Sequence, residues 1–306
     1  MKLSILILFS FLTALAAGEA KQVSESGIKH SMFIAGSVTA ITDESGKIIR
    51  KLPGGSRDGY VLPNGNVVVA YARDVREFTP DNKIAFSYKL DKVNKEISTV
   101  QPIKGGFLVC EAGKKPRLLE VAPDGKVTKE IPIQPEGNNI HMQSRMARKL
   151  PNGNYLVPHL FAFAAKEYDS TGKLLRSFKT DTEELGGRAT KHWPFTAIRK
   201  ENGNTVLACT QSHEVLEFDK DAKLIWRLTN KDLGEKLIVD ACGMQLLPNG
   251  NLVIASYGQR NKAGVKMFEV TPEKKVVWRY YNPNIKSVHD FQILTTNGTK
   301  VENPQK

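Results

Sequence analysis

Histidine and arginine side chains are the groups in this sequence best suited to chemistry. An imidazole acts as a nucleophile or an acid–base group near neutral pH, and a guanidinium group holds an anion through two parallel hydrogen bonds. Five of the six histidines fall in segments that begin strands or connect them, together with several arginines and aspartates. These segments supply our candidate catalytic residues: His289, His192, His141, Arg145, Arg57 and Asp290.

The chemistry expected of this set is attack by a neutral imidazole on an anionic substrate, with guanidinium groups stabilising the charge that develops. Asp290 or Asp240 would orient the imidazole by accepting its second N–H. A further group of residues from the same segments is expected to bind the ligand: Asp58, Arg188, Lys191, Trp193, His213 and Asp240. For each residue alone, an ordinary hydrogen bond within a loop is the alternative. The sequence does not decide which histidine would be the nucleophile.

A repeat of forty to fifty residues must position these side chains. Glycines in similar turns occur at positions 65, 105, 153, 203, 250 and 298, with spacings of 40, 48, 50, 47 and 48 residues. This period, with several short strands in each unit, is typical of a β-propeller. The clearest copies read Leu-Pro-Asn-Gly-Asn, which predicts a hairpin with Asn-Gly at the centre of a type I′ turn. A glutamate recurs in the third strand of each unit, which indicates a scaffold role: Glu77, Glu120, Glu167, Glu217 and Glu269.

We predict an all-β fold, a six-bladed β-propeller of four-stranded antiparallel blades. Residues 31–52 have the pattern of strands two to four of a blade, and residues 288–294 have the pattern of the missing inner strand. The two termini would therefore close one composite blade and remove its free edges. A count of five or seven blades would require a repeat to be wrongly merged or split.

The predicted connections place the candidate residues on one face. Short turns join strands one and two, and strands three and four, and these turns share one face of a propeller. Longer and more varied segments lie on the other face, at 133–143, 179–193, 229–240 and 257–265. Long loops on a rigid scaffold commonly carry function. Because inner strands converge on the central axis, residues far apart in sequence can meet there.

The ends of the sequence predict export. Residues 1–18 combine Lys2 with an apolar run and small residues, which is the pattern of a cleaved signal peptide, and we expect a periplasmic or extracellular protein. Residues 19–30 are expected to be a linker, residues 31–298 the propeller and residues 299–306 a tail. No other segment has the length and hydropathy of a transmembrane span.

Composition restricts the partners. The formal net charge is +12, which favours an anionic small molecule or polysaccharide, although a basic exported protein without such a ligand is the alternative. An exported propeller offers no helix for a nucleic-acid groove, so nucleic acid is not expected. Three scattered cysteines indicate buried thiols rather than disulfides, with a reactive thiol at Cys242 as the alternative. We expect a monomer.

The repeats resemble a known family. Leu-Pro-Asn-Gly-Asn followed by Phe268-Glu269-Val270-Thr271-Pro272 resembles the repeats of bacterial arylsulfotransferase-like propellers and, more loosely, PQQ-like repeats, over residues 31–298. The resemblance implies six blades, catalytic His and Arg at the top of the axis, and sulfuryl transfer through a modified histidine. It also assigns His289-Asp290 to the His-Asp pair that opens an inner strand in that family. The chain is shorter than those enzymes, and the stacking tryptophans and metal-binding acids of PQQ enzymes are not found, so we expect no cofactor and no metal.

Two functions follow. The first is an exported binding or scaffold propeller that recognises an anionic ligand or a protein partner through its basic, loop-rich face. The second is an arylsulfotransferase-like group transferase, or a lyase, that acts on anionic substrates at the mouth of the axis. A repeat signature specifies a fold and not an activity, so the sequence leaves both open.

Overall fold

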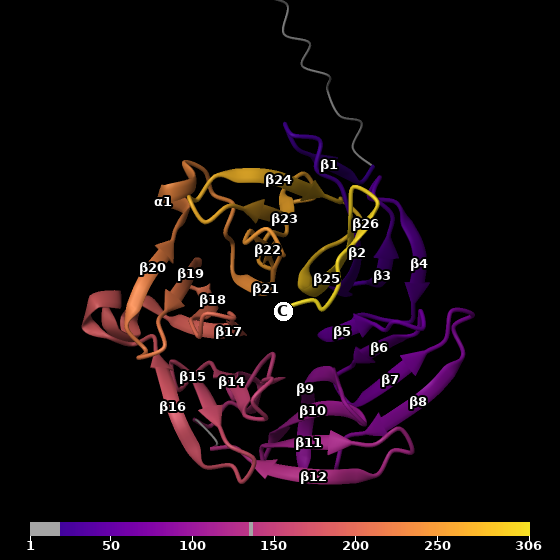
Figure 1. Cartoon of the computed structure of the whole chain (residues 1–306), viewed down its shortest axis with the longest axis vertical. Coiled ribbons are helices and arrows are strands. Elements are labelled where there is room, and N and C mark those ends of the chain that lie inside the picture. The colour runs from indigo at the N-terminus through magenta and orange to yellow at the C-terminus, as the bar shows by residue number, and fades with distance from the viewer. Residues whose placement is uncertain (1–18, 135–136) are drawn as a thin grey trace, which may run out of the picture.

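Six antiparallel sheets form a ring around a central axis (Figure 1). The computed structural model describes residues 19–134 and 137–306. The signal peptide expected over residues 1–18 lies outside these residues. Each sheet contains four strands in simple order from the axis outward, and two sheets gain a fifth strand. The predicted six-bladed propeller is confirmed.

Five blades use consecutive strands. In chain order their strands are β5 (Asp58–Val61), β6 (Val67–Ala70), β7 (Asp74–Phe78) and β8 (Ile84–Lys89); β9 (Asn94–Ile103), β10 (Gly106–Gly113), β11 (Arg117–Val121) and β12 (Val127–Pro132); β13 (Arg148–Lys149), β14 (Tyr155–His159), β15 (Ala164–Tyr168) and β16 (Leu174–Lys179); β17 (His192–Arg199), β18 (Thr205–Gln211), β19 (Glu214–Phe218) and β20 (Leu224–Leu228); and β21 (Ala241–Leu246), β22 (Leu252–Ser256), β23 (Val265–Val270) and β24 (Val276–Tyr281). Short helices lie in the connections: η1 (Ile140–Met142), η2 (Glu183–Leu185), η3 (Gly187–Thr190) and α1 (Asn230–Leu233).

The sixth blade is closed by both ends of the chain. Its inner strand is β25 (Val288–Thr296), and its outer strands are β2 (His30–Gly36), β3 (Thr39–Thr42) and β4 (Ile48–Leu52). β25 pairs antiparallel with β2, with Phe291 opposite Ile34. Both faces of β25 and β2 are largely buried, and alternating side chains, including Met32, Ile34, Phe291 and Ile293, join one apolar cluster with the neighbouring blade. The predicted composite blade is confirmed.

The segments expected to be a linker and a tail are ordered parts of the fold. Within 19–30, β1 (Lys21–Val23) adds to the outer edge of β24. Gln22 accepts hydrogen bonds from the Trp278 indole (2.7 Å) and from the main chain of His30 (2.8 Å). At the other end, β26 (Thr299–Lys300) pairs with β25, and residues 301–306 continue to the centre of the ring (Figure 1).

The Asn-Gly turns differ in type from the prediction. In Leu62-Pro63-Asn64-Gly65, the Gly65 N–H donates to the Leu62 carbonyl at 2.9 Å, and only Gly65 has a positive φ, of 81°. Pro63 fixes a negative φ at the first central position, so Pro63-Asn64 forms a type I turn and Gly65 takes the left-handed position after it. The type I′ assignment was therefore wrong, although the hairpin and its position were correct.

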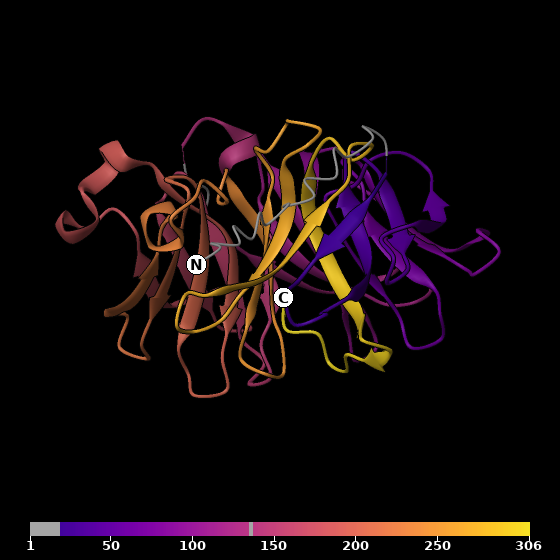
Figure 2. The same cartoon turned by 90° about the horizontal axis from the view of Figure 1, so that it is seen from above.

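The recurrent glutamates have the scaffold role predicted for them. Glu167 accepts a hydrogen bond from the Asn154 side chain at 2.7 Å, and Glu217 accepts one from Asn204 at 2.8 Å. Glu77 and Glu269 make the same bond to Asn66 and Asn251. Each of these four glutamates ties the third strand of its blade to the turn between the first two, whereas Glu120 accepts from Lys149 and Tyr155 of the next blade. Figure 2 shows the ring from the side, with β26 on the face opposite to the loop that contains η1. No helix in the described part of the chain is long and apolar enough to cross a membrane.

Candidate functional site

Several of the predicted residues meet at one end of the central axis. Arg57 precedes β5 and Arg145 precedes β13, while His141 lies in η1 and His289 in β25. The connections on the loop-rich face bring these side chains together although they are far apart in sequence. We call this region the axial mouth, and it consists of Arg57, Glu96, His141, Arg145, Tyr257, Arg260 and His289.

Glu96 in β9 organises the cations of the axial mouth. Its carboxylate accepts from Arg57 at 2.9 Å and from His141 Nδ1 at 3.1 Å, and Arg145 lies at 3.4 Å. Burial alone would raise the pKa of Glu96, but the hydrogen bonds from His141 and Arg57 and the charge of Arg145 lower that pKa to about 2. Glu96 is therefore a fixed negative charge at neutral pH.

Arg145 is the most deeply placed of these cations. Its guanidinium group is 2% exposed and donates to the main-chain oxygens of Ser144 (2.7 Å) and His141. Burial and then the positive charge of Arg57 lower the pKa of Arg145 to about 10, while Glu96 opposes the shift. Arg145 still carries its charge at neutral pH, and it lies above the Phe195 ring at 6.0 Å from its centre.

A β-bulge directs His289 into the axial mouth. Ala35 pairs with Asp290 and Gly36 pairs with Val288, so His289 is the extra residue of β25 at this point. An equivalent irregularity in β17 leaves Phe195 as the extra residue. Bulges change the direction of a side chain at the rim of a sheet. The Phe195 and His289 rings approach to 5.9 Å between centres, and the Tyr257 ring lies 4.4 Å from His289.

His289 is a neutral imidazole. Its surroundings lower its pKa to about 3, first because burial disfavours the charged ring, and then because Arg145 and Arg57 repel a further positive charge. The Nδ1 atom is buried and has no hydrogen-bond partner within the described chain. His289 therefore offers a neutral ring nitrogen beside several fixed cations.

An apolar cluster and a cleft border the axial mouth. Phe195 and Cys242 are buried in the cluster, with Trp193, Phe161 and Tyr257 packed against them. On the other side, a cleft of about 560 Å³ is lined by Glu96, His141 and the residues around them. The lining of this cleft is mostly polar, with Lys95, Asn138 and Asn139 beside Glu96 and His141.

Asp290 and Asp58 do not belong to the axial mouth. The Asp290 carboxylate contacts the Lys306 ammonium, deeper in the channel than His289. Asp290 thus does not orient the imidazole, contrary to the prediction. Asp58 in β5 is fully buried in the same deeper region.

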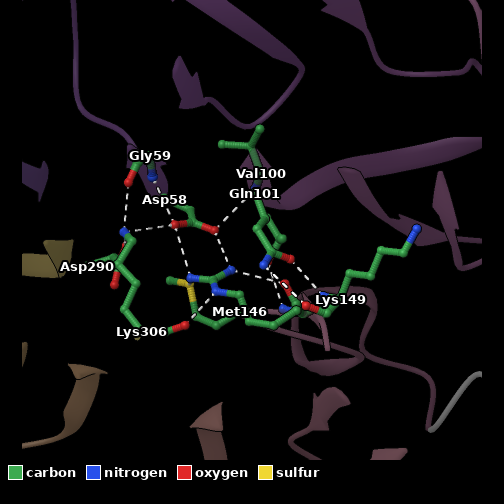
Figure 3. Close-up of polar contacts among 11 residues, drawn as sticks. Asp58, Gly59, Val100, Gln101, Met146, Lys149, Asp290 and Lys306 are labelled. Atoms are coloured by element: carbon green, nitrogen blue, oxygen red, sulfur yellow. Dashed lines mark hydrogen bonds and ion pairs between the residues drawn. The ribbon is translucent and has the colours of Figure 1, made fainter. Parts of the chain in front are cut away.

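These two aspartates form a buried ion cluster with Arg148 and Lys306 (Figure 3). Arg148 donates to Asp58 at 2.8 Å and to the main-chain oxygen of Lys306 at 2.9 Å. The Lys306 ammonium contacts Asp290, lies 3.5 Å from Asp58, and donates to the Gly59 carbonyl at 2.7 Å. Two carboxylates and two cations from three blades and the C-terminal segment are joined in this way.

The two carboxylates of the cluster share their charge unequally. Burial, and then the negative charge of Asp58, raise the pKa of Asp290 to about 7, against the opposing effect of Lys306. For Asp58 burial acts in the same direction, but Arg148 and Lys306 outweigh it and lower its pKa. A proton retained near neutral pH therefore belongs to Asp290.

His192 lies in a separate cluster. It is 1% exposed, and its two ring nitrogens contact Glu214 at 3.0 Å and the Thr190 hydroxyl at 2.7 Å. Glu214 also accepts two hydrogen bonds from Arg227; burial would raise the pKa of Glu214, but the hydrogen bonds from His192 and then from Arg227 lower it. These contacts fix the start of β17 and keep His192 away from the axial mouth.

The other predicted ligand-binding residues lie around the same face without joining the axial mouth. The His213 ring accepts the Asp240 N–H at 2.9 Å, and Asp240 accepts from the main chain of Gln211 at 3.0 Å, so this pair closes a loop. Asp240 is therefore not the acid that orients His289. Arg188 is exposed and pairs with Asp181 at 3.0 Å. Lys191 is exposed and has a φ of 54°, in the left-handed region, and Trp193 packs against Phe161 at 5.2 Å.

No group of three metal-ligating side chains comes together within residues 19–134 and 137–306. Cys110, Cys209 and Cys242 are free and buried. Burial raises the pKa of the Cys242 thiol well above its usual value, so this thiol does not supply a thiolate nucleophile at neutral pH.

Sequence comparison now places the chain in a family. The model of the Mal s 1 allergenic protein-like family matches residues 60–238, which is more than half of the sequence. The chain belongs to this family. No curated protein matches the sequence of this Mal s 1-like protein. The match supports a propeller repeat family, and the finer resemblance to arylsulfotransferase-like or PQQ-like repeats stays a prediction.

Solved structures similar to the Mal s 1-like protein share its fold. A protein of unknown function from Bacteroides caccae is 21% identical, with a TM-score of 0.75, over 86% of this chain and 98% of that one. Virginiamycin B lyase from Staphylococcus aureus, in a catalytically inactive form with quinupristin, is 12% identical, with a TM-score of 0.59, over 88% and 90%. A putative 6-phosphogluconolactonase from Bacteroides fragilis is 15% identical, with a TM-score of 0.55, over 92% and 98%. At these identities the likeness shows the fold alone.

Sequence reasoning missed several residues that build the two axial clusters of the Mal s 1-like protein. Glu96, Tyr257 and Arg260 were not selected. Glu96 lies in the blade with the weakest turn signature, so its strand was not placed. Arg148 had a usable signal, because it lies two residues before its Leu-Pro-Asn-Gly turn, where the other clear repeats have Tyr60 and Gln245. A charge at this inner-strand position indicates a buried partner. Lys306 had no such signal.

Proposed function

We propose that this Mal s 1-like propeller binds a small organic anion at the axial mouth. One observation carries the proposal: the axial mouth holds three guanidinium groups, of Arg57, Arg145 and Arg260, but a single carboxylate, Glu96, which pairs with Arg57 and Arg145. Three positive charges and one negative charge leave an excess of two positive charges. This excess lies in a partly buried site, where charge interactions are stronger than in water.

The other side chains of the axial mouth favour an anion with an apolar part. The Tyr257 and Phe195 rings flank His289, and the Arg260 guanidinium lies 4.5 Å from the centre of the Tyr257 ring. An apolar or aromatic portion of the ligand would pack on these rings while its anionic group faces Arg57 and Arg145. The neutral His289 ring adds one hydrogen bond and no repulsion beyond that of the arginines.

A second function, group transfer or a lyase reaction on an anionic substrate, is favoured by the neutral imidazole beside the guanidinium groups. In the arylsulfotransferase-like version, Nε2 of His289 would bond to the sulfur as the ester S–O bond breaks and a phenolate leaves, and the sulfuryl group would then pass to an acceptor hydroxyl. Attack by Nε2 requires the proton on Nδ1, and no described residue accepts that proton. Catalytic imidazoles are normally oriented by such an acceptor, so we favour binding over transfer.

The test measures ligand binding and turnover on the same protein. Isothermal titration calorimetry and thermal shift would compare 4-nitrophenyl sulfate, 4-nitrobenzoate and neutral 4-nitrobenzamide, and release of 4-nitrophenolate would report transfer to added phenol. We expect both anions to bind and the amide to bind at least tenfold more weakly. Arg57→Gln should weaken anion binding about tenfold, since one charge-assisted contact is lost.

Arg279→Gln is the matched control. Arg279 lies in the outer strand β24 and pairs with one carboxylate, that of Glu235, so this substitution also removes one positive charge and one ion pair, but far from the axial mouth. Equal binding of the amide and the anions, or equal losses in Arg57→Gln and Arg279→Gln, would contradict the proposal. Release of nitrophenolate that His289→Ala abolishes would favour the transferase over the binding protein.

A further inference from the structure

The ion cluster at the other end of the channel holds an ammonium group in a cage of complementary groups. Lys306 Nζ contacts the Asp290 carboxylate and the Gly59 carbonyl, and it lies 4.0 Å from the centre of the Tyr60 ring. Asp58 completes the cage at 3.5 Å. Asp58, Asp290 and the Lys306 side chain are fully buried. Two carboxyl groups, one carbonyl and one aromatic face thus surround one cation.

We propose that this cage, formed by Asp58, Gly59, Tyr60 and Asp290, is a binding site for a primary alkylammonium group. Lys306 fills it from within the same chain, and its Nζ takes the place of the ligand's amine. The site is separate from the axial mouth, so the proposal does not depend on the function proposed above.

The cage walls do not need Lys306 to hold them in place. Asp58 is fixed by the Gly59 N–H at 2.8 Å, the Val100 N–H at 3.1 Å and Arg148 at 2.8 Å, and these donors come from three different strands. Asp290 lies in the inner strand β25, and its Oδ1 atom is buried without a hydrogen-bond partner. The donors to Asp58 therefore keep a preformed negative charge in the site without Lys306.

The composition of the cage favours an organic ammonium over a metal ion. A divalent cation such as Ca²⁺ takes six to eight oxygen ligands, whereas this cage offers one carbonyl and two carboxylates, one of which is held by Arg148. The positive charge of Arg148 would also repel a divalent metal ion. The Tyr60 face attracts an alkylammonium group through its ring quadrupole, an interaction that adds about 0.5–2 kcal/mol.

The cage has a route to solvent on the face of the short turns. A cavity of about 730 Å³ opens there, and Tyr60, Arg148, Gln292 and Lys306 contribute to its lining. Residues 301–306 form part of its wall, and main-chain bonds join Val301 to Leu294 and Leu246 to Gln305, each at 2.9 Å. Because Tyr60 and Lys306 both line this cavity, removal of the Lys306 side chain opens the cage toward it and lets an outside amine enter.

The experiment is chemical rescue of Lys306→Ala, which removes the ammonium but leaves the main-chain bond to Arg148. Butylammonium has the chain length of a lysine side chain, and butanol is its neutral counterpart. We expect Lys306→Ala to bind butylammonium in calorimetry at least tenfold more tightly than the wild type does, and to regain thermal stability with butylammonium but not with butanol at equal ionic strength. Lys300→Ala, which changes an exposed lysine of β26 next to this segment, is the control and should behave as the wild type does.

The double variant Lys306→Ala/Asp290→Asn tests the cage itself. It should bind butylammonium at least tenfold more weakly than Lys306→Ala does. Should Lys306→Ala not fold alone, the same comparison of butylammonium with butanol is made on its refolding yield. Equal effects of the amine and the alcohol, or equal binding by the single and double variants, would overturn the proposal. Tight binding of Ca²⁺ to Lys306→Ala without binding of butylammonium would also overturn it, in favour of a metal site.

Discussion

The substitution Asp290→Asn should remove a pH dependence from the stability of the protein. Asp290 is fully buried, and burial together with the charge of Asp58 raises its pKa from an ordinary 3.8 to about 7. The native state therefore holds a proton that the unfolded chain has already lost above pH 5. A raised pKa of the native state contributes stability that is present at low pH and is lost as pH rises through 7.

The size of the effect follows from proton linkage. Between pH 6 and pH 8 the native carboxyl goes from about nine-tenths protonated to about one-tenth, while the unfolded carboxyl is ionised throughout. The average difference is half a proton over two pH units, so this group removes about 1.4 kcal/mol of unfolding free energy across that range. Asparagine has the shape of the protonated acid and no titration, so the variant lacks this loss. The lowered pKa of Asp58 acts in more acidic solution and does not enter this range.

The assay is urea unfolding at pH 6, 7 and 8 at constant ionic strength, on wild type and Asp290→Asn. The quantity of interest is the free energy of the wild type minus that of the variant, in which the titration of the histidines cancels. It should fall by about 1.4 kcal/mol from pH 6 to pH 8. Asp124→Asn, an exposed turn residue, should leave the wild-type pH profile unchanged. A difference that stays constant over this range, or that rises, would refute the assignment of the proton to Asp290.

Three further predictions concern other parts of the molecule. Gly36→Ala would place a Cβ 2.1 Å from the Ser287 carbonyl where the composite blade closes, so we expect a loss of at least about 3 kcal/mol in chemical denaturation, against about 1 kcal/mol for Gly298→Ala, whose Cβ meets open space. Gln22→Ala leaves the Trp278 indole and the His30 N–H without their acceptor, so we expect it to lower the free energy of unfolding by about 1–3 kcal/mol. A loss no larger than that of the neighbouring Lys21→Ala would contradict this role of Gln22. Glu96→Gln leaves the buried Arg145 without its charge partner and should destabilise the protein by about 3 kcal/mol. Added 4-nitrobenzoate should stabilise this variant more than it stabilises the wild type. An unchanged melting temperature of the variant without ligand would contradict the pairing.

The blades could be predicted from the sequence because each one repeats the same local rules. The turn from Leu247 to Asn251 and the glutamate at 269 recur in register with their copies, and the absence of an inner strand before residue 31 indicated where the ring closes. The turn type could not be obtained from Asn-Gly alone, because the preceding proline decides which two residues occupy its centre.

The candidate site was harder to predict because its residues do not repeat. Arg57, Arg145, His141 and His289 lie near one another because all precede or begin inner strands on one face, and their functional roles stay predictions. The direction of a side chain within an inner strand depends on a bulge, and the bulge at His289 leaves no separate mark in the sequence. For this reason Asp290 was assigned to the wrong end of the channel. The segment 301–306, with no repeat pattern, gave no indication that Lys306 enters the axis.

The closure of the ring by β25 has a consequence for how the chain acquires its structure. Ile34 and Phe291 face each other across 257 positions, whereas every other blade is made of consecutive hairpins. Contacts of such long range form late, because the entropy of closing the intervening loop must be overcome first. Until then β2 presents an unpaired edge, which a β25 strand from a second molecule fits equally well. Refolding at high protein concentration should therefore produce domain-swapped dimers, in which β25 of each molecule completes the composite blade of the other. Refolding at low concentration should favour the monomeric ring.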